Sequence, residues 1–273
     1  MIRKLYVLLD FSVYSKSELQ LAKKWSDWYN LEIIVLHEME MPLPTMASYE
    51  QRLKILYDQK REVSKLWFPL VEEVFGNTHL LKFEILDEPL ISYLKKHLGS
   101  SGEDLIMMGL KGSGKLKQIF IGSMVNMVVE QLNHITIAVP KNLGDFEPNQ
   151  LLVSVHPKFD FNEDAFEQLM EVIPKSIHTV QFMSVVTEDD DKEEIRKFLR
   201  QISSSNYKGL KCKTAIFSGN DAFAEIKNHF SGRNDFILVL QKGSRSFSDK
   251  IFRKFMVNEL VYDGSIPLII LPS

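Results

Sequence analysis

Short apolar runs alternate along the chain with longer stretches in which apolar residues recur at helical spacing. In the first half, five runs are short and bounded by turn residues, which predicts buried strands. They lie at residues 5–9, 33–37, 80–86, 104–108 and 135–139. Helices are predicted between them, the longest over residues 49–75. Strands that are apolar throughout and alternate with helices predict a parallel sheet covered on both faces.

The first predicted helix carries a start signal. Ser15 and Glu18 have the spacing of a capping box, in which two side chains satisfy backbone N–H groups at the helix start. Leu19, Ala22 and Trp25 continue at helical spacing. We therefore expect the helix to begin at Ser15 and to be capped by these two residues.

The same pattern then occurs a second time. After a polar linker at 141–149, the strands recur at 151–156, 180–186, 235–239 and 266–272, and residues 221–230 repeat the helix that begins at Pro89. In this alignment His156 stands opposite Asp10, and Leu240 stands opposite Gly109. The sequence therefore predicts a tandem repeat of one α/β unit, with domains at residues 1–142 and 149–273.

The last strand of each repeat is strongly apolar and is followed directly by proline. These strands lie at residues 135–139 and 267–271. An edge strand exposes unpaired N–H and C=O groups, which proteins usually cover. We therefore expect the two strands to pair, so that the chain forms an intrachain pseudo-dimer. Whether whole chains also form a homodimer stays open.

The loop after the fourth predicted strand is rich in glycine and lysine, and a helix-like segment opens at Gly122-Ser123. Glycines let a backbone approach a ligand closely, and the first N–H groups of a helix can accept an anion. Two familiar phosphate-binding motifs each lack a required residue in this loop. A P-loop needs Ser or Thr where Leu116 stands, and a dinucleotide fingerprint needs glycine at Lys117. The simplest alternative is a mobile surface turn with solvated lysines.

A third pattern fits without a gap: Gly109, two residues, Gly112, nine residues, Gly122 and Ser123. With Asp10-Phe11-Ser12 after the first strand and Leu36-His37 in the second, it resembles the ATP-binding motif of the universal stress protein family. The resemblance spans nearly the whole chain, as two tandem domains. It implies that each is a doubly wound, five-stranded parallel sheet that is Rossmann-like and similar to the adenine nucleotide alpha hydrolases.

The resemblance also implies an ATP site in the first half. Asp10 would contact adenine or ribose, and the backbone at Glu38 would meet the adenine. The glycine loop and the following helix start would hold the phosphates, with Lys111 and Lys115 as further phosphate contacts or as solvated loop residues. The implied site comprises Leu9, Asp10, Glu38, Met108, Gly109, Gly112, Gly122, Ser123 and Met124, with ATP and magnesium as ligands. Asp10 has a second reading, as a cap of the next helix.

The second half departs from this motif. His156 replaces Asp10, only Gly243 survives, opposite Gly112, and no Gly-Ser pair remains around Arg253. Bulky side chains would stand where the backbone has to touch phosphate. We therefore expect a degenerate copy that does not bind ATP, and one nucleotide per chain.

Composition narrows the classes of partner. A net charge of −3 gives no general attraction to nucleic acid or to an anionic membrane. The single cysteine, Cys212, cannot form an internal disulfide. No apolar run approaches the roughly 20 residues of a membrane span, and the first residues lack a signal-peptide core. The seven histidines include no pair at helical metal-binding spacing. These features favour a cytoplasmic protein without a membrane or nucleic-acid partner.

Three functions stay open at this point. The first is an ATP-binding regulator with a role in stress response and little or no turnover, as the resemblance implies. The second is a nucleotide-free interaction or scaffold protein of the same fold. The third is an ATP-using enzyme, for which Ser123 is the only hydroxyl at a motif position. Slow hydrolysis or autophosphorylation would fall in this last class.

Overall fold

Ten strands form one sheet with the order β3-β2-β1-β4-β5-β10-β9-β6-β7-β8. The computed structural model describes residues 4–39, 48–76, 81–99, 103–110, 123–144, 146–218, 230, 232–244 and 266–273. The strands are β1 (Lys4–Leu8), β2 (Glu32–Glu38), β3 (Leu81–Leu86), β4 (Asp104–Gly109), β5 (Thr136–Val139), β6 (Gln150–Ser154), β7 (Thr179–Val186), β8 (Lys211–Ser218), β9 (Phe236–Gln241) and β10 (Leu268–Leu271). The helices are α1 (Ser15–Tyr29), α2 (Tyr49–Phe75), α3 (Leu90–His97), α4 (Ser123–Gln131), α5 (Glu163–Met170) and α6 (Lys192–Ser203).

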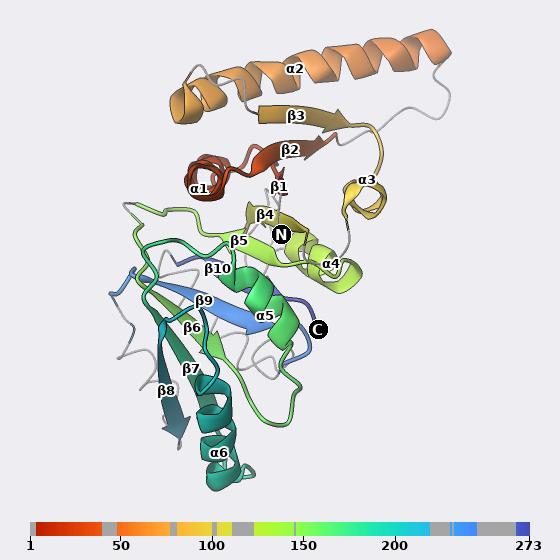
Figure 1. Ribbon diagram of the computed structural model, residues 1–273. Coiled ribbons are helices and arrows are strands. Elements are labelled where there is room, and N and C mark those ends of the chain that lie inside the picture. The colour runs from red at the N-terminus through yellow and green to blue at the C-terminus, as the bar shows by residue number, and fades with distance from the viewer. Residues whose placement is uncertain are drawn as a thin grey trace.

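The two halves of the sheet have the same internal order. Read from its outer edge, the first half runs β3-β2-β1-β4-β5, and the second runs β8-β7-β6-β9-β10. All strand pairs within a half are parallel. The predicted α/β fold is therefore confirmed, and its two sets of five strands join into a single sheet (Figure 1). The predicted helix at residues 221–230 lies almost wholly outside the described residues.

The two halves meet at an antiparallel strand pair. β5 lies against β10, with Ile137 opposite Ile269 at the centre of the pair. Both isoleucines are completely buried. The predicted pairing of the two terminal strands is therefore confirmed.

Helix α1 ties the halves together on one face of the sheet. The indole Nε1 of Trp25 donates to the carbonyl of Val172 at 2.7 Å, and the hydroxyl of Tyr29 donates to the carbonyl of Ile173. Trp25 is fully buried, so its N–H needs this partner. The first half is thus fixed to the segment that follows α5 by side-chain contacts as well as by the sheet.

Corresponding positions of the two halves share a hydrogen-bond pattern. The N–H of Leu9 donates to the carbonyl of Leu36, and the N–H of Val155 donates to that of Met183, each at 2.9 Å. At the next position, His37 bonds the carbonyl of Leu9 at 2.8 Å through Nδ1, while the hydroxyl of Ser184 donates to the carbonyl of Val155. His37 is therefore a hydrogen-bonded structural residue, and the match indicates that the halves repeat in detail.

The register corrects one part of the predicted alignment. Gly109 pairs with Val139 at the end of β5, and Gln241 pairs with Leu271 at the end of β10. Gln241 therefore corresponds to Gly109, and the expected match to Leu240 was wrong by one residue. The same shift moves Gly243 away from Gly112. The run from Phe236 to Leu240 is entirely apolar, so its pattern has no phase that could fix the alignment.

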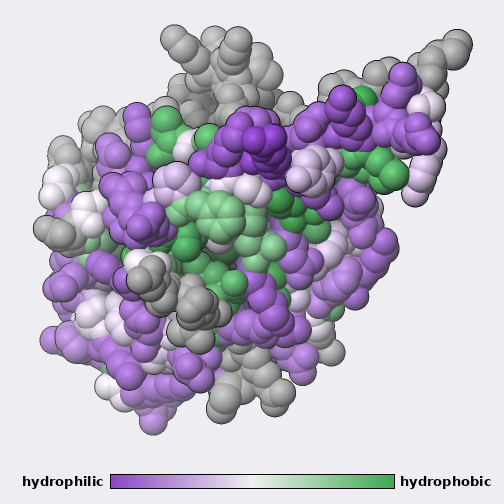
Figure 2. Space-filling model, turned by 90° about the horizontal axis from the view of Figure 1, so that it is seen from above, coloured by the Kyte–Doolittle hydropathy of each residue, from purple (hydrophilic) through white to green (hydrophobic). Residues whose placement is uncertain are grey.

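Helix α2 is long and little buried. Of its 27 residues only Trp67 is buried, and its ring stacks on Phe83 of β3 at 4.1 Å between centroids. Ser48 and Gln51 form a capping box at its start. One end of α2 extends beyond the strands, and polar residues cover much of the outer side of the helix seen in Figure 2. Even so, no helix in the described part of the chain is long and apolar enough to cross a membrane.

The antiparallel pair of β5 and β10, which is the seam between the two halves, should be a main source of stability. Ile137→Ala should lower the free energy of unfolding by about 2–5 kcal/mol, because it leaves a cavity at a fully buried position. Leu53→Ala, at an exposed position of α2, should change it by less than about 0.5 kcal/mol. Urea unfolding followed by circular dichroism measures both. Equal effects of the two substitutions would contradict the importance given to the seam.

Candidate functional site

The winding of the sheet reverses at β1. The chain passes from β1 through β2 to β3 on one side, and then crosses to place β4 on the other side of β1. Ligands of such sheets bind beyond the carboxyl ends of the strands at this switch point. Leu8 and Met108 are in register there, so Asp10 and Gly109 follow at the same edge of the sheet. The structure therefore brings these two predicted site residues together.

Asp10 shapes the turn that leads from β1 into α1. Its Oδ1 accepts a hydrogen bond from the N–H of Ser12 at 2.9 Å, and the Ser12 hydroxyl accepts one from the N–H of Tyr14 at 3.3 Å. Phe11 has a left-handed φ of 54° between them. The side chain of Asp10 thus stabilises a tight turn just before α1, whose N-cap residue is Tyr14.

The expected capping box at Ser15 and Glu18 is wrong. Tyr14 is the N-cap residue, so Ser15 is already the first residue of α1. Ser15 and Glu18 are 2% and 1% exposed, and their side chains point into the protein. Neither the hydroxyl of Ser15 nor either carboxyl oxygen of Glu18 has a hydrogen-bond partner in the part of the chain that the structure describes. The turn at Asp10 and Ser12 occupies the place where the capping box was expected.

Glu18 lies directly against Gly109. A Cβ atom on Gly109 would stand 2.5 Å from Oε1 of Glu18 and 2.9 Å from Cβ of Tyr14, closer than real contacts allow. Only glycine fits at this position. The glycine that the sequence assigns to a ligand therefore has a second reason to be there, the approach of α1 to the end of β4.

Glu18 favours its protonated form. Burial raises the pKa of its carboxyl group well above the ordinary value, and the nearby charge of Asp10 raises it further. The backbone of Gly109 acts in the opposite direction but completes no hydrogen bond of normal geometry. A buried carboxyl group without a donor is more stable when it is neutral.

Other predicted site residues have structural roles. The carboxylate of Glu38 accepts a hydrogen bond from the N–H of Leu90 at 3.1 Å, so it caps the start of α3. Leu9 and Met108 are buried in the core, where they hold Asp10 and Gly109 in place. The expected contact between the backbone at Glu38 and an adenine stays a prediction.

The phosphate end of the predicted site is described only in part. Ser123 is exposed at the first position of α4, and Met124 is half-buried against the core. Gly112, Gly122, Lys111 and Lys115 lie outside the described residues. The first N–H groups of α4 have no acceptor within the helix, as at any helix start.

Side chains fill the corresponding switch point of the second half. Gln241, which replaces Gly109, accepts at Oε1 from the N–H of Asn162 and donates from Nε2 to the carbonyl of Asp160, both at 2.7 Å. It therefore spans the gap between the end of β9 and the loop after β6. Both ends of this buried amide are satisfied.

His156, which stands opposite Asp10, belongs to a second polar cluster. Its Nδ1 accepts from the N–H of Lys158 at 3.3 Å, and its Nε2 lies 3.4 Å from Oδ1 of Asp190. The Lys158 ammonium donates to the same Oδ1 at 2.7 Å, and the N–H and hydroxyl of Thr187 donate to Oδ2. A buried carboxylate with this many donors is fully compensated.

Sequence reasoning missed Ser15 and Glu18 as inward-facing residues. Glu18 precedes Leu21, Ala22 and Trp25 by three, four and seven residues, the spacing of one buried helix face. The position of Glu18 on the apolar face of the helix was a signal that it is buried. Its spacing from Ser15 also suits a capping box, which is why a cap was predicted instead.

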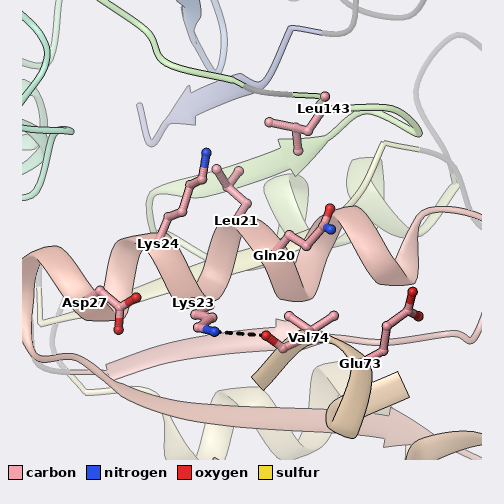
Figure 3. Close-up of a pocket in the computed structure, with 9 residues that line it drawn as sticks. Gln20, Leu21, Lys23, Lys24, Asp27, Glu73, Val74 and Leu143 are labelled. Atoms are coloured by element: carbon pink, nitrogen blue, oxygen red, sulfur yellow. Dashed lines mark hydrogen bonds between the residues drawn. The ribbon is translucent and has the colours of Figure 1, made fainter. Parts of the chain in front are cut away.

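A cavity of about 380 Å³ lies between α1, the end of α2 and the linker at Leu143 and Gly144 (Figure 3). Lys23 donates across it to the carbonyl of Val74 at 3.0 Å, and Lys24 donates to the carbonyl of Phe146 at 3.1 Å. These lysines hold neighbouring segments in place. The cavity is not lined by Asp10, Glu18 or Gly109, so it is separate from the switch point.

The described residues contain no group of three or more His, Cys, Asp or Glu side chains that could hold a metal ion.

No protein family and no curated protein matches the chain. Solved structures do match it. A universal stress protein from Archaeoglobus fulgidus DSM 4304 is similar with a TM-score of 0.61 at 17% identity, over 98% of each chain. A functionally unknown protein from Pseudomonas aeruginosa PAO1 has a TM-score of 0.54 at 12% identity, over 99% of this chain and 93% of that one. A provisionally named universal stress protein from Pseudomonas aeruginosa UCBPP-PA14 has a TM-score of 0.54 at 11% identity, with the same coverage. These similarities show a shared fold.

Gly109→Ala should lower the free energy of unfolding by about 1–3 kcal/mol, because the new methyl group overlaps Glu18 and Tyr14. Glu18→Ser should relieve part of that overlap, so the double substitution should cost less than the sum of the two single ones. Urea unfolding of the four proteins measures this coupling. Strict additivity would mean that Glu18 does not occupy the space beside Gly109.

Glu18→Gln should change how stability depends on pH. The raised pKa of Glu18 means that the folded state binds its proton more tightly than the unfolded state does. Its contribution is fully present below pH 4.5 and is lost as pH rises through the pKa in the folded protein. The stability of the glutamine variant relative to the unsubstituted protein should therefore increase with pH. A difference that stays constant from pH 4 to 9 would contradict the burial of an ionisable group at this position.

Proposed function

We propose that this chain is an ATP-binding universal stress protein, a regulator in which nucleotide occupancy alters contacts with a partner and turnover is slight or absent. The observation that carries the proposal is the meeting of Asp10 and Gly109 at the switch point between β1 and β4. The glycine spacing up to Ser123 and the fold shared with a universal stress protein support it. Such a regulator would act in the cytoplasm.

The residues at the switch point fit a nucleotide in part. Asp10 could accept hydrogen bonds from ribose hydroxyls, and Ser123 with the N–H of Met124 could donate to phosphate oxygens at the start of α4. Gly112 and Gly122 would complete the phosphate cradle that their spacing predicts. ATP would supply a phosphate charge that magnesium partly neutralises. Glu38 contributes no side-chain contact to this arrangement, because its carboxylate caps α3.

A single site per chain follows from the contrast between the halves. Gln241 stands in place of Gly109, and its amide crosses to the loop at Asp160 and Asn162. Both amide ends would have to lose their partners before a ligand could approach the backbone there. We therefore assign the nucleotide to the first half alone.

The second candidate function is a nucleotide-free interaction or scaffold protein. Five of the seven exposed large apolar side chains in the described part of the chain lie on α2: Tyr49, Leu53, Tyr57, Leu66 and Phe68. Apolar side chains gathered on one exposed element often mark an interaction surface. Binding of ATP would separate the two candidates.

Calorimetric titration with ATP and magnesium should give one site per chain. Two equivalent sites would contradict the account of Gln241. No heat at millimolar ATP, together with no ATP in mass spectra of the natively purified protein, would favour the scaffold function.

Asp10→Ala should weaken ATP binding by about 1–3 kcal/mol, through the loss of hydrogen bonds to ribose in a partly buried site. It should barely affect binding of inorganic triphosphate, which has no ribose. Lys158→Ala, in the corresponding loop of the second half, should leave ATP affinity unchanged. Equal losses for both ligands in the Asp10 variant would mean that the carboxylate acts only through the turn at Ser12.

Gly122→Val should abolish ATP binding while the circular dichroism spectrum stays unchanged, because the branched side chain would fill the expected position of a phosphate. Gly122 lies outside the described residues, so the expectation rests on its spacing. Unchanged affinity would remove this glycine from the site.

A further inference from the structure

We infer that Ser15 and Glu18 are ligand-binding residues of the first-half site, and that Glu18 meets the ligand as a neutral carboxylic acid. This inference rests on the proposed function and names the chemistry of its ligand, an oxyanion such as a phosphate group. Neither residue belongs to the motif that suggested the site.

The two side chains lack hydrogen-bond partners among the residues that the structure describes. The hydroxyl of Ser15 and both carboxyl oxygens of Glu18 are buried there without a hydrogen bond. The two residues are three positions apart at the start of α1, so they lie on the same face of the helix. Buried polar groups in native proteins are nearly always paired with protein or ordered solvent. Three orphaned atoms on one helix turn therefore point to a missing partner.

The second half of the chain has no buried acid at the corresponding position. Phe166 is the fourth residue of α5, as Glu18 is of α1, and its side chain is completely buried. Gln241, opposite Gly109, has both ends of its amide bonded. The same fold is thus built in the second half without a buried acid here. The orphaned groups of the first half are not a requirement of the architecture.

Glu18 also lies at the place where a ligand of this sheet is expected. Oε1 of Glu18 lies 2.5 Å from the point where Gly109 would carry a Cβ. Gly109 ends β4 beside Asp10 at the switch point, where a ligand of this sheet would bind. The acid therefore stands at the place where the glycine-rich loop begins.

Charge decides the form in which Glu18 meets a ligand. Among the described groups on α1, on the loop after β1 and at the end of β4, Asp10 is the charged neighbour that acts on it. The ammonium of Lys16, two residues away, is held at the surface by Glu73. An ionised Glu18 beside Asp10 would repel a phosphate, whereas the neutral acid can donate its proton in a hydrogen bond. Ser15 can donate a second one.

The test is the affinity for ATP and for inorganic triphosphate from pH 6 to 9 in the full chain and its variants. Glu18→Ala should lose about 10-fold to 100-fold in affinity at pH 6, as expected for a hydrogen bond to a charged group. Glu18→Gln keeps a donor without a titrating proton, so the ratio of its affinity to that of the unsubstituted protein should rise at the pH where Glu18 of the ligand-free protein ionises, and should not fall at any pH. Taking the ratio removes the titration of the ligand itself. Ser15→Ala should weaken both ligands, and Lys16→Ala should weaken neither.

A direct readout of protonation keeps the inference independent of folding effects. The carboxyl carbon of Glu18, observed by NMR in protein labelled at glutamate and assigned with the glutamine variant, should remain in the protonated range to higher pH when ATP is bound. One-to-one ATP binding with no effect of Glu18→Ala, or a ratio that falls as pH rises, would overturn the inference and leave the proposed function standing. Failure of the unsubstituted protein to bind either ligand would overturn both.

Discussion

The antiparallel pairing of β5 with β10 is the contact on which the rest of the structure depends. Without this pairing, each strand would be an apolar strand at the edge of its sheet. Its unpaired backbone N–H and C=O groups would promote aggregation. Their pairing removes two edges and makes one sheet of ten strands. It also runs the strands of the two halves in opposite directions. The carboxyl ends of the first-half strands therefore lie at one end of the sheet and those of the second half at the other. The two switch points cannot merge into a single site, and self-association of whole chains would have to use a surface other than β5.

Features that both halves share are required by the fold, whereas features found in only one half belong to its site. Both halves use the same backbone bond between their first two strands, with His37 and Ser184 each bonding the carbonyl that follows the first strand. They differ at the point where α1 or α5 meets the end of β4 or β9. One half has a glycine under a buried acid, and the other has a glutamine that reaches across to a loop. At this point the described parts of the two halves differ in the residue that ends the strand, Gly109 or Gln241, and in the residue at the fourth position of α1 or α5, Glu18 or Phe166.

Apolar runs predicted the fold well. A strand that is buried on both faces is apolar throughout, with no alternation of apolar and polar residues, so its short length and the flanking turn residues identify it. The same property limited the alignment: in β9 every residue before Gln241 is apolar, so only the pairing with β10 fixes the register. The start of α1 was misread for a different reason. The spacing of Ser15 and Glu18 suits a capping box, but the turn at Asp10 and Ser12 places the helix start one residue earlier, so both side chains turn inward. Asp10 and Gly109 were expected in one site from the resemblance, and the register of β1 with β4 brings them to the same edge of the sheet. Glu18 was not expected there, because its role depends on a tertiary contact.

Gly109 shows why a glycine motif is not by itself proof of a nucleotide. A side chain at this position is excluded by Glu18 and Tyr14 whether or not a ligand is ever present. The glycine would therefore be kept even in a copy that had lost its ligand, as long as the acid remained. The buried acid is harder to explain in that way. Desolvation makes it costly, nothing in the fold of the second half requires it, and its oxygens have no partner in the part of the chain that the structure describes. Glu18 thus supports a ligand at this switch point independently of the meeting of Asp10 and Gly109.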